Sequence, residues 1–396
     1  MNQILELEIT ERLLRLRDDP DAGLRDEVCY EQPVWEYKDR ALWEAEREYI
    51  FRGVPLLAAL SCQLPSPGDW IAFDEAGLPI LLVRGQDGAV RAFLNVCRHR
   101  GARLVDEACG SARRFTCPFH GWVYNEDGCL VGMPAPRAFE GMCREDRGLR
   151  PVTVEEWGGA IWILASSTPA MLDVQQHLGP LGEEFRQYAF DELHFVERRV
   201  NRTRANWKLA MDTYTEGYHV PYLHKNSLGP LSLQGLALYD ALGDHYRQAF
   251  ALVPLEGMAS QSKDQWRPFE TFAFGLQYII YPNTMFFIAP NHVELYQVFP
   301  GDAVDTVVTI ATLFSSVPLT DDAERANLVA QFDFFYNIVA NEDYRMADGI
   351  ERVLQSAANE TFVFGRVEPI MQTLHKRYHR QIAEGRVCSG VLSSAR

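Results

Sequence analysis

Two short segments of this sequence each place a cysteine and a histidine close together. Cys97 and His99 lie in VCRHRG, and Cys117 and His120 follow in CPFHGW after a gap of 17 residues. Thiolate and imidazole groups are strong ligands for transition metals. A glycine follows each histidine, which is typical of a short loop with a turn, and two such loops can approach one site from opposite sides. The spacing therefore predicts a metal centre built from these four side chains.

The order of the ligands bears on which metal they would bind. Two cysteines and two histidines can hold one tetrahedral zinc ion, but in such sites the cysteine pair and the histidine pair normally cluster separately. Here each cysteine has a histidine beside it. That alternation suits a two-iron cluster in which the cysteines bind one iron and the histidines bind the other. Zinc, or four unrelated buried side chains, is the alternative.

The remaining cysteines are too few for a disulfide scaffold in a chain of 396 residues. A reducing compartment would also disfavour disulfides. We expect Cys62, Cys109, Cys129 and Cys143 to be reduced, partly buried small side chains with no role in the chemistry.

A second group of ionisable residues lies in ANWKLAMDTYTEGYHVPYLHK, residues 205 to 225. A helix over 207–219 would place Asp212, Glu216 and His219 at positions i, i+4 and i+7. Residues at this spacing share one face of a helix. The pattern therefore predicts three ionisable groups on one surface.

A proline follows this group and bears on how two histidines could meet. We expect Pro221 to end the helix near Val220, because proline cannot continue a helix without losing a hydrogen bond. His219 and His224 are five residues apart and would diverge on an unbroken helix. A turn after Pro221 would let both imidazoles reach one metal.

Two histidines near one metal suggest a carboxylate as third ligand, because two histidines and one carboxylate bind non-heme Fe(II) in oxygenases. Asp343 is the candidate, since it lies within the apolar stripe of a helix predicted over 321–355, where an unpaired carboxylate is costly. Glu342 lies off this stripe and is expected to face water. The alternative is that the two histidines are core residues and Asp343 pairs with an arginine. The stripe consists of Tyr336, Val339, Ala340, Met346, Ala347, Ile350 and Leu354.

The elements that would position these residues change character along the chain. Residues 1–20 and 41–50 have helical periodicity, and 54–165 reads as short strands separated by turns. Residues 170–225 read as mainly helical, and 240–318 as strands. The fold class expected is α+β, with a small all-β module followed by a larger domain in which helices back a wide antiparallel sheet.

Charge and hydropathy exclude several classes of function. The net charge of −16 argues against nucleic-acid binding, which needs clustered lysine and arginine. The first 20 residues lack the basic flank and apolar run of a secretion signal, and no apolar run is long enough to cross a bilayer. We therefore expect a cytoplasmic protein with no membrane association. No glycine-rich dinucleotide motif follows a strand, so NAD(P)H should not bind this chain.

The Cys-His segments and the later histidine and carboxylate segments together resemble the motifs of a known family. CRHRG and CPFHGW, continued by Trp122, Tyr124 and the turn Asp127-Gly128, resemble the Rieske [2Fe–2S] signature, with Phe119 where tyrosine is common. Three further segments resemble the catalytic motifs of Rieske non-heme iron oxygenase α-subunits of the aromatic-ring-hydroxylating type. They are NWK, the acid-x-x-His-x4-His pattern that follows it, and EDYRMADGIERVLQS. The last segment has Glu-Arg-Val-Leu where Gln-Arg-Gly-Leu is common. The resemblance spans roughly residues 40 to 380.

The resemblance implies a fold and its domains. A small all-β Rieske domain would occupy residues 46–166. A helix-grip (START-like) catalytic domain, with an antiparallel sheet flanked by helices, would occupy 167–396. Residues 1–45 would form an N-terminal helical segment that packs on the catalytic domain.

The resemblance also implies a role for each candidate residue. Cys97 and Cys117 would bind one iron of the [2Fe–2S] cluster, and His99 and His120 the other. Mononuclear Fe(II) would be held by His219, His224 and Asp343. Glu216 would bridge the two centres, from His120 of one subunit to His219 of its neighbour. Asp212 would be either a second partner that orients an imidazole or an acid on the helix face.

The activity implied is that of the terminal oxygenase component of a multicomponent system. It would use O2 and electrons from a separate NAD(P)H-dependent reductase, with or without a ferredoxin, as a homotrimer or an α3β3 assembly. We expect hydroxylation or oxidative demethylation of a small, aromatic substrate, in aromatic hydrocarbon catabolism. The alternatives are a monooxygenase of quaternary ammonium compounds, a Rieske electron-transfer protein without oxygenase activity, and a zinc-containing binding protein. Candidate pocket residues are Leu228, Leu231, Leu233, Phe274, Tyr278 and Phe287.

Overall fold

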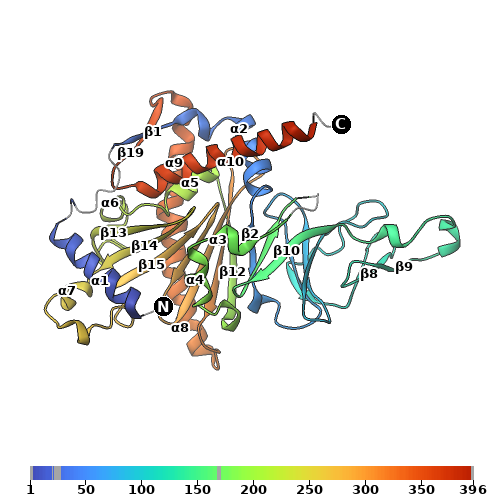
Figure 1. Cartoon of the computed structure of the whole chain (residues 1–396), viewed down its shortest axis with the longest axis horizontal. Helices are drawn as coiled ribbons and strands as arrows, with labels where there is room; N and C mark the ends of the chain where they lie inside the picture. Colours follow the sequence, from blue (N-terminus) through green and yellow to red (C-terminus); the bar gives the residue numbers. More distant parts are fainter. Residues whose placement is uncertain (1–2, 20, 22–27, 167–170, 394–396) are drawn as a thin grey trace. The chain divides into compact units, whose positions relative to one another are not determined.

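The computed structural model describes residues 3–19, 21, 28–166 and 171–393. The chain divides into two compact units (Figure 1). We call the first, Arg47–His177 with Ala189–Glu192, the β unit, and the second, which holds the rest, the α+β unit. The expected boundary after residue 166 falls beside residues 167–170, which lie outside the described residues. The division into 1–45, 46–166 and 167–396 stays a prediction.

The β unit is built from antiparallel strands. A seven-stranded sheet has the order β2-β11-β10-β5-β4-β3-β6, and a separate three-stranded sheet has the order β7-β8-β9. The strands are β2 (Leu56–Leu60), β3 (Asp69–Phe73), β4 (Ile80–Arg84), β5 (Val90–Leu94), β6 (Cys109–Ser111), β7 (Arg114–Thr116), β8 (Val123–Asn125), β9 (Leu130–Gly132), β10 (Pro151–Trp157) and β11 (Ala160–Leu164). The all-β texture predicted for 54–165 is therefore confirmed.

The turns of this unit lie where the sequence places them. Gly77 and Gly88 have φ angles of 78° and 82°, in the left-handed region that glycine adopts at no steric cost. They join β3 to β4 and β4 to β5, so that Phe73 pairs with Ile80 and Arg84 with Val90.

The α+β unit contains one wide antiparallel sheet of seven strands, in the order β12-β18-β17-β16-β15-β14-β13. Every residue of β17 and β18 is buried, which means that both faces of the sheet are covered at its middle. Edge strand β12 has one buried residue and otherwise mostly alternates half-buried and exposed residues. The strands are β12 (His194–Thr203), β13 (Ser232–Leu242), β14 (His245–Leu252), β15 (Phe274–Ile280), β16 (Thr284–Ile288), β17 (His292–Pro300) and β18 (Val307–Ser315).

Helices accompany this sheet, and a short pairing of β1 (Tyr30–Pro33) with β19 (Thr361–Phe364) joins distant parts of the unit (Figure 1). Helix α1 is anchored to β13 through Arg12, which donates to Asp240 at 3.0 and 2.5 Å. Within the described residues, the α-helices of both units are α1 (Gln3–Asp18), α2 (Arg40–Glu46), α3 (Val174–Leu178), α4 (Leu181–Arg186), α5 (Trp207–Asp212), α6 (Val220–Leu223), α7 (Leu255–Met258), α8 (Asp322–Ile338), α9 (Tyr344–Val353) and α10 (Pro369–Ser393).

The long helix predicted over 321–355 is interrupted. It begins with Asp321 as N-cap, whose side chain accepts a hydrogen bond from the backbone of Glu324 at 2.7 Å. A π-helical turn over Val339–Asp343 separates α8 from α9. Such turns rotate the following residues and occur frequently at functional sites. Here the turn ends at Asp343.

Two helical predictions are wrong in part. The stretch 170–225 contains the ten-residue strand β12, which pairs with β18 along its length. Helix 207–219 ends at Asp212, the last residue of α5. Pro221 does not end a helix but lies in the first turn of α6, where a missing backbone N–H costs nothing. Within the part of the chain that the structure describes, no helix is long and apolar enough to cross a membrane.

Candidate metal centres

The two Cys-His loops of the β unit have the same backbone geometry. The amide of Cys97 donates to the carbonyl of Ala102 and the amide of Cys117 to that of Trp122, each at 2.7 Å. The amides of Gly101 and Gly121 donate back to the carbonyls of Cys97 and Cys117, each at 3.0 Å. Both glycines have positive φ angles, which explains why glycine follows each histidine.

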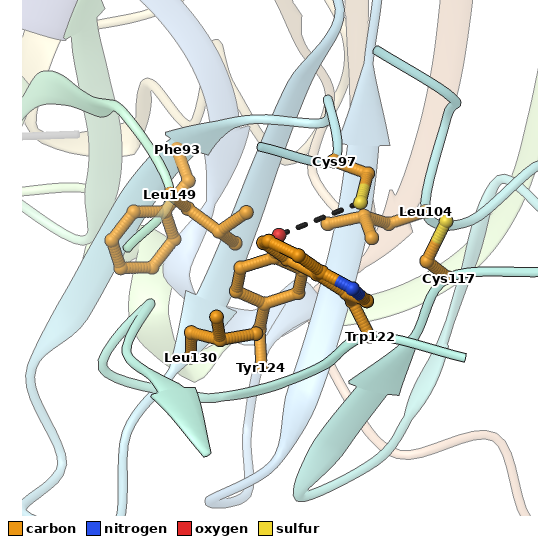
Figure 2. Close-up of a cluster of buried hydrophobic side chains, with 8 residues drawn as sticks. All are labelled: Phe93, Cys97, Leu104, Cys117, Trp122, Tyr124, Leu130 and Leu149. Atoms are coloured by element: carbon orange, nitrogen blue, oxygen red, sulfur yellow. Dashed lines mark hydrogen bonds between the residues drawn. The ribbon is translucent and has the colours of Figure 1, made fainter. Parts of the chain in front are cut away.

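The two thiols lie in a buried, largely apolar cluster (Figure 2). Tyr124 is fully buried beside them, and its hydroxyl accepts a hydrogen bond from the amide of Arg98 at 2.9 Å and lies 3.4 Å from Sγ of Cys97. Burial, and then the neighbouring Cys97, raises the pKa of Tyr124 above its usual value. The phenol therefore stays protonated at neutral pH, and it can donate to Sγ of Cys97 when that sulfur is a thiolate.

The two histidines of these loops lie together. Their rings are 4.6 Å apart at 74°, and His99 stacks on Trp122 with centroids 4.8 Å apart. The Nδ1 atoms of His99 and His120 are buried without a hydrogen-bond partner. Two thiols and two unpartnered imidazole nitrogens are the donor set that a Rieske cluster requires.

The same four residues fit a single zinc ion less well. Ligands of one tetrahedral zinc lie within about 4 Å of one another. Among the described residues, the only group of three or more such donors within 4.8 Å of one another is His219, His224 and Asp343. The Cys-His loops therefore do not converge on one ion, whereas a two-iron cluster needs its ligands spread over two centres.

His219, His224 and Asp343 form the second centre, in the α+β unit. Nε2 of His219 and Nε2 of His224 are 3.1 Å apart, and each lies 3.3 Å from Oδ1 of Asp343. Asp343 and His224 are buried. Two of the three side chains come from the ends of α6, because His219 is its N-cap and His224 its C-cap. The two imidazoles were expected to meet through a turn after Pro221. In the structure they meet because the single helical turn of α6 lies between them.

Carboxylates hold the outer nitrogens of both imidazoles. Nδ1 of His224 lies 2.9 Å from Oε2 of Glu342, and Nδ1 of His219 contacts Oε1 of Glu216. Carboxylate partners fix the tautomer with the proton on Nδ1, which turns the lone pair of Nε2 toward the other ligands. Two nitrogen lone pairs and one carboxylate oxygen then face one point, which is an arrangement that suits a bound cation.

The charge distribution favours a cation in this position. Burial alone would lower the pKa of His219, but Asp343 and Glu216 outweigh it and raise that pKa to about 10. Burial would raise the pKa of Asp343, but hydrogen bonds and charge interactions with His219 and His224 lower it. In the absence of metal these carboxylates attract protons, and two histidines with one carboxylate are the ligands of non-heme Fe(II).

The structure separates the remaining candidates. Glu216 lies at the metal centre, whereas Asp212 does not contact His219 or His224. Its two oxygens instead bond Tyr37 and His375, each at 2.9 Å. Asp212 therefore belongs to a buried network between α5 and α10.

Sequence reasoning missed Glu342. It was expected to face water, but it accepts hydrogen bonds from Ser227 at 3.0 Å and from His224. The signal was its position beside Asp343 in a segment that the π-helical turn distorts, and helical periodicity cannot detect such a distortion. The neighbouring cysteines also differ from expectation, because Cys109, Cys129 and Cys143 are exposed.

A cavity of about 470 Å³ adjoins the His219–His224–Asp343 centre. Its size is typical of a small-molecule site. Three of the expected pocket residues, Leu228, Leu231 and Phe287, line it. The other three do not: among them, Phe274 and Tyr278 are buried in the sheet.

Comparisons with known proteins agree with this geometry. Residues 55–153 match the family model of the Rieske [2Fe–2S] domain, and residues 190–384 match that of the ring hydroxylating alpha subunit (catalytic domain). The chain is 27% identical over 342 residues to the carnitine monooxygenase oxygenase subunit of Acinetobacter baumannii, which covers 83% of this chain and 86% of that protein.

Two other relatives align over about half of the chain. The glycine betaine monooxygenase oxygenase subunit of Pseudomonas aeruginosa is 32% identical over 197 residues, which is 49% of this chain and 45% of that one. The chloroplastic choline monooxygenase of Spinacia oleracea is 34% identical over 211 residues, 52% of this chain and 47% of that one.

Solved structures share the fold. A quaternary ammonium Rieske monooxygenase in complex with L-carnitine superposes with a TM-score of 0.75 at 23% identity, over 92% of this chain and 97% of that one. Naphthalene 1,2-dioxygenase with bound indole gives a TM-score of 0.70 at 18% identity, over 89% and 92%. In this chain a Rieske domain precedes a ring-hydroxylating catalytic domain, and the relatives of the chain are oxygenase subunits. The cofactors of such a protein are a [2Fe–2S] cluster and a mononuclear iron. The chain therefore belongs to the Rieske non-heme iron oxygenases as a terminal oxygenase component.

Proposed function

We propose that this chain is the oxygenase component of a monooxygenase that acts on a quaternary ammonium compound. The observation that carries the proposal is the aromatic-walled cavity beside three converging metal-binding side chains, in a chain whose relatives are named for carnitine, glycine betaine and choline. The aromatic substrate expected from the motifs, with its role in aromatic hydrocarbon catabolism, has weaker support. The likeness to naphthalene dioxygenase at 18% identity is one of fold.

The proposed reaction balances with two external electrons. One atom of O2 enters a C–H bond of the substrate, the other leaves as water, and two electrons and two protons are consumed. When bound, the cluster supplies single electrons and the mononuclear iron supplies the place where O2 is reduced. Hydroxylation of a carbon that already bears nitrogen or oxygen gives a product that collapses to an aldehyde, so aldehyde release is a direct measure of turnover.

The chain's own residues hold and orient the two centres in this proposal. Cys97, Cys117, His99 and His120 would hold the cluster, and the hydroxyl of Tyr124, 3.4 Å from Sγ of Cys97, could donate to that sulfur as a thiolate. His219, His224 and Asp343 hold the mononuclear iron, and Glu342 fixes the ring of His224. Glu216 fixes the ring of His219 and is the bridging acid to a cluster histidine of a neighbouring subunit. The largely apolar cavity wall excludes water from the reacting carbon.

The partners proposed are those of a multicomponent oxygenase. Electrons come from a separate NAD(P)H-dependent reductase, directly or through a ferredoxin, and the subunits form a homotrimer in the cytoplasm. The net charge of −16 suits an electropositive docking surface on the electron donor, since complementary charge raises association rates.

Electron paramagnetic resonance of the anaerobic, reduced protein with nitric oxide tests both centres. We expect a reduced-Rieske signal together with a ferrous–nitrosyl signal that trimethylammonium compounds perturb. A Rieske signal without a ferrous–nitrosyl signal in an iron-replete preparation would favour the electron-transfer alternative. If indole or naphthalene perturbs the ferrous–nitrosyl signal and is turned over, and ammonium compounds do neither, the proposed substrate class is wrong.

A further inference from the structure

We infer that the substrate is an organic ammonium cation with a neutral, hydroxyl-bearing tail and no carboxylate. This inference rests on the proposed function, because it takes the cavity beside His219, His224 and Asp343 as the substrate site. It narrows that function, since carnitine and glycine betaine carry a carboxylate whereas choline carries a hydroxyl.

The described residues that line the cavity include three acids but no lysine and no arginine. Apart from the phenols of Tyr214 and Tyr296, the ionisable side chains there are the two histidines of the metal centre and three acids: Glu216, Asp343 and Glu294. Both histidines already have carboxylate partners. A substrate carboxylate would therefore lose its hydration and find no lysine or arginine to pair with, which is a large penalty in a water-poor site. The only cation there would be the iron, whose charge Asp343 already offsets in part.

Glu294 is the acid that the metal centre does not use. It is fully buried in β17 and borders the cavity. Its Oε1 lies 3.2 Å from Nε2 of His292, and its Oε2 accepts a hydrogen bond from Tyr296 at 2.7 Å. Burial raises the pKa of Glu294, which favours its neutral form. A carboxyl group in the wall gives a substrate carboxylate no cation to pair with, and it does not repel an ammonium head.

Aromatic rings supply the favourable contact for an ammonium head. Phe272, Phe287 and Phe335 form one connected group, with ring centroids 6.2 and 4.9 Å apart. Tyr214 and Tyr296 form another, 5.8 Å apart. All five line the cavity. Aromatic faces attract cations, and desolvated quaternary ammonium groups are bound in this way.

Ser232 supplies the contact for the tail. It lines the cavity at the start of β13, and its Oγ is buried without a hydrogen-bond partner. A buried hydroxyl without a partner is costly, so a ligand that offers a neutral oxygen at this place would gain by satisfying it. A hydroxyl can both donate to and accept from Ser232, whereas a carboxylate would bring an uncompensated charge.

Matched substrates test the charge argument on the reconstituted full chain with an electron donor. Choline, glycine betaine and carnitine share the trimethylammonium head, and 3,3-dimethyl-1-butanol is choline with carbon in place of nitrogen. We expect aldehyde release from choline with a kcat/KM at least about tenfold above those of the two carboxylates. The neutral analogue should bind at least about fivefold more weakly than choline.

The outcomes separate the inference from the function on which it rests. A carboxylate-bearing substrate that matches or exceeds choline would overturn the inference and leave the quaternary ammonium function intact. Turnover of aromatic hydrocarbons alone would overturn both. Equal binding of choline and its neutral analogue would overturn the role of the positive charge.

A variant tests the tail contact. Ser232→Ala should weaken choline binding roughly two- to tenfold and leave the binding of ethyltrimethylammonium, which lacks the hydroxyl, unchanged. Ser260→Ala is the matched control, because Ser260 is exposed and bonds only its own turn at Gly257. Equal weakening of both ligands would indicate a structural role, and no change for choline would overturn the assignment of Ser232.

Discussion

Nδ1 of His224 and Oε2 of Glu342 are 2.9 Å apart. This contact fixes the orientation of His224, a proposed iron ligand, and the carboxylate that makes it belongs to the neighbour of Asp343 in the chain. Glu342 also accepts a hydrogen bond from Ser227, so its carboxylate is itself held in place. The ring of His224 is thereby set by two elements, α6 and the π-helical turn before α9.

Replacement of Glu342 by alanine should weaken iron binding about ten- to hundredfold, because partners of metal-bound imidazoles contribute that much to affinity. The [2Fe–2S] absorption should be unchanged. Iron titration followed by the ferrous–nitrosyl signal measures the effect. Asp348→Ala is the control, since Asp348 on α9 pairs with Arg352 near the surface. If both variants lose iron equally, the effect comes from α9 and not from the contact with His224.

The sequence predicted the ligand types better than the elements that carry them. Cys97, His99, Cys117 and His120 were predicted as ligands from spacing alone, because glycine-bearing loops leave a local signature. Asp343 was predicted because a charged residue stands out in an apolar stripe, and the structure places it beside His219 and His224. The contacts of Glu342 and Asp212 depend on residues more than 100 positions away, and no periodicity in a single sequence carries such information. The helix over 207–219 failed for a similar reason, since tertiary contacts override local propensity.

Glu216→Gln should leave both metal centres occupied and slow electron transfer from the cluster. The amide still meets the ring of His219 but no longer provides the charge that steadies it. Single-turnover oxidation of the reduced protein by O2 should slow at least about tenfold. Glu368→Gln is a matched control, because Glu368 lies near Glu216 but bonds the backbone of Gly365. If Glu216→Gln is oxidised by O2 at the wild-type single-turnover rate, Glu216 does not bridge the two centres in electron transfer as proposed.

The cysteines outside the Rieske loops should differ in reactivity. Burial raises the pKa of the Cys62 thiol to about 12, so at pH 8 only about 1 molecule in 10,000 carries the reactive thiolate. Cys109 and Cys129 are exposed and should react with iodoacetamide first. Cys143 is exposed, but its hydrogen bond to Glu145 raises its pKa, so it should follow more slowly. Peptide mass spectrometry over time checks the order, and early labelling of Cys62 would contradict it.

The anchor of α1 on the sheet should make stability depend on pH. Burial would raise the pKa of Asp240, but the guanidinium groups of Arg12 and Arg247 outweigh it and lower that pKa below its usual value. A lowered folded-state pKa means that the pairing stabilises the protein above the unfolded-state pKa of about 4. The contribution is lost as the pH falls from there through the folded-state pKa.

Asp240→Asn should therefore destabilise the protein by about 2 kcal/mol at pH 7, because it removes the anion that the partly buried Arg12 and Arg247 share. Arg247 keeps its pairing with Glu184, and Arg12 keeps the longer contact with Glu8. The difference from wild type should be constant above about pH 5 and shrink below about pH 4. Urea unfolding at several pH values measures it. Asp18→Asn is the control, because the largely exposed Asp18 pairs with Arg17 on the same helix and should cost less than about 1 kcal/mol. A difference that persists undiminished at the lowest pH would show that the loss comes from packing and not from charge.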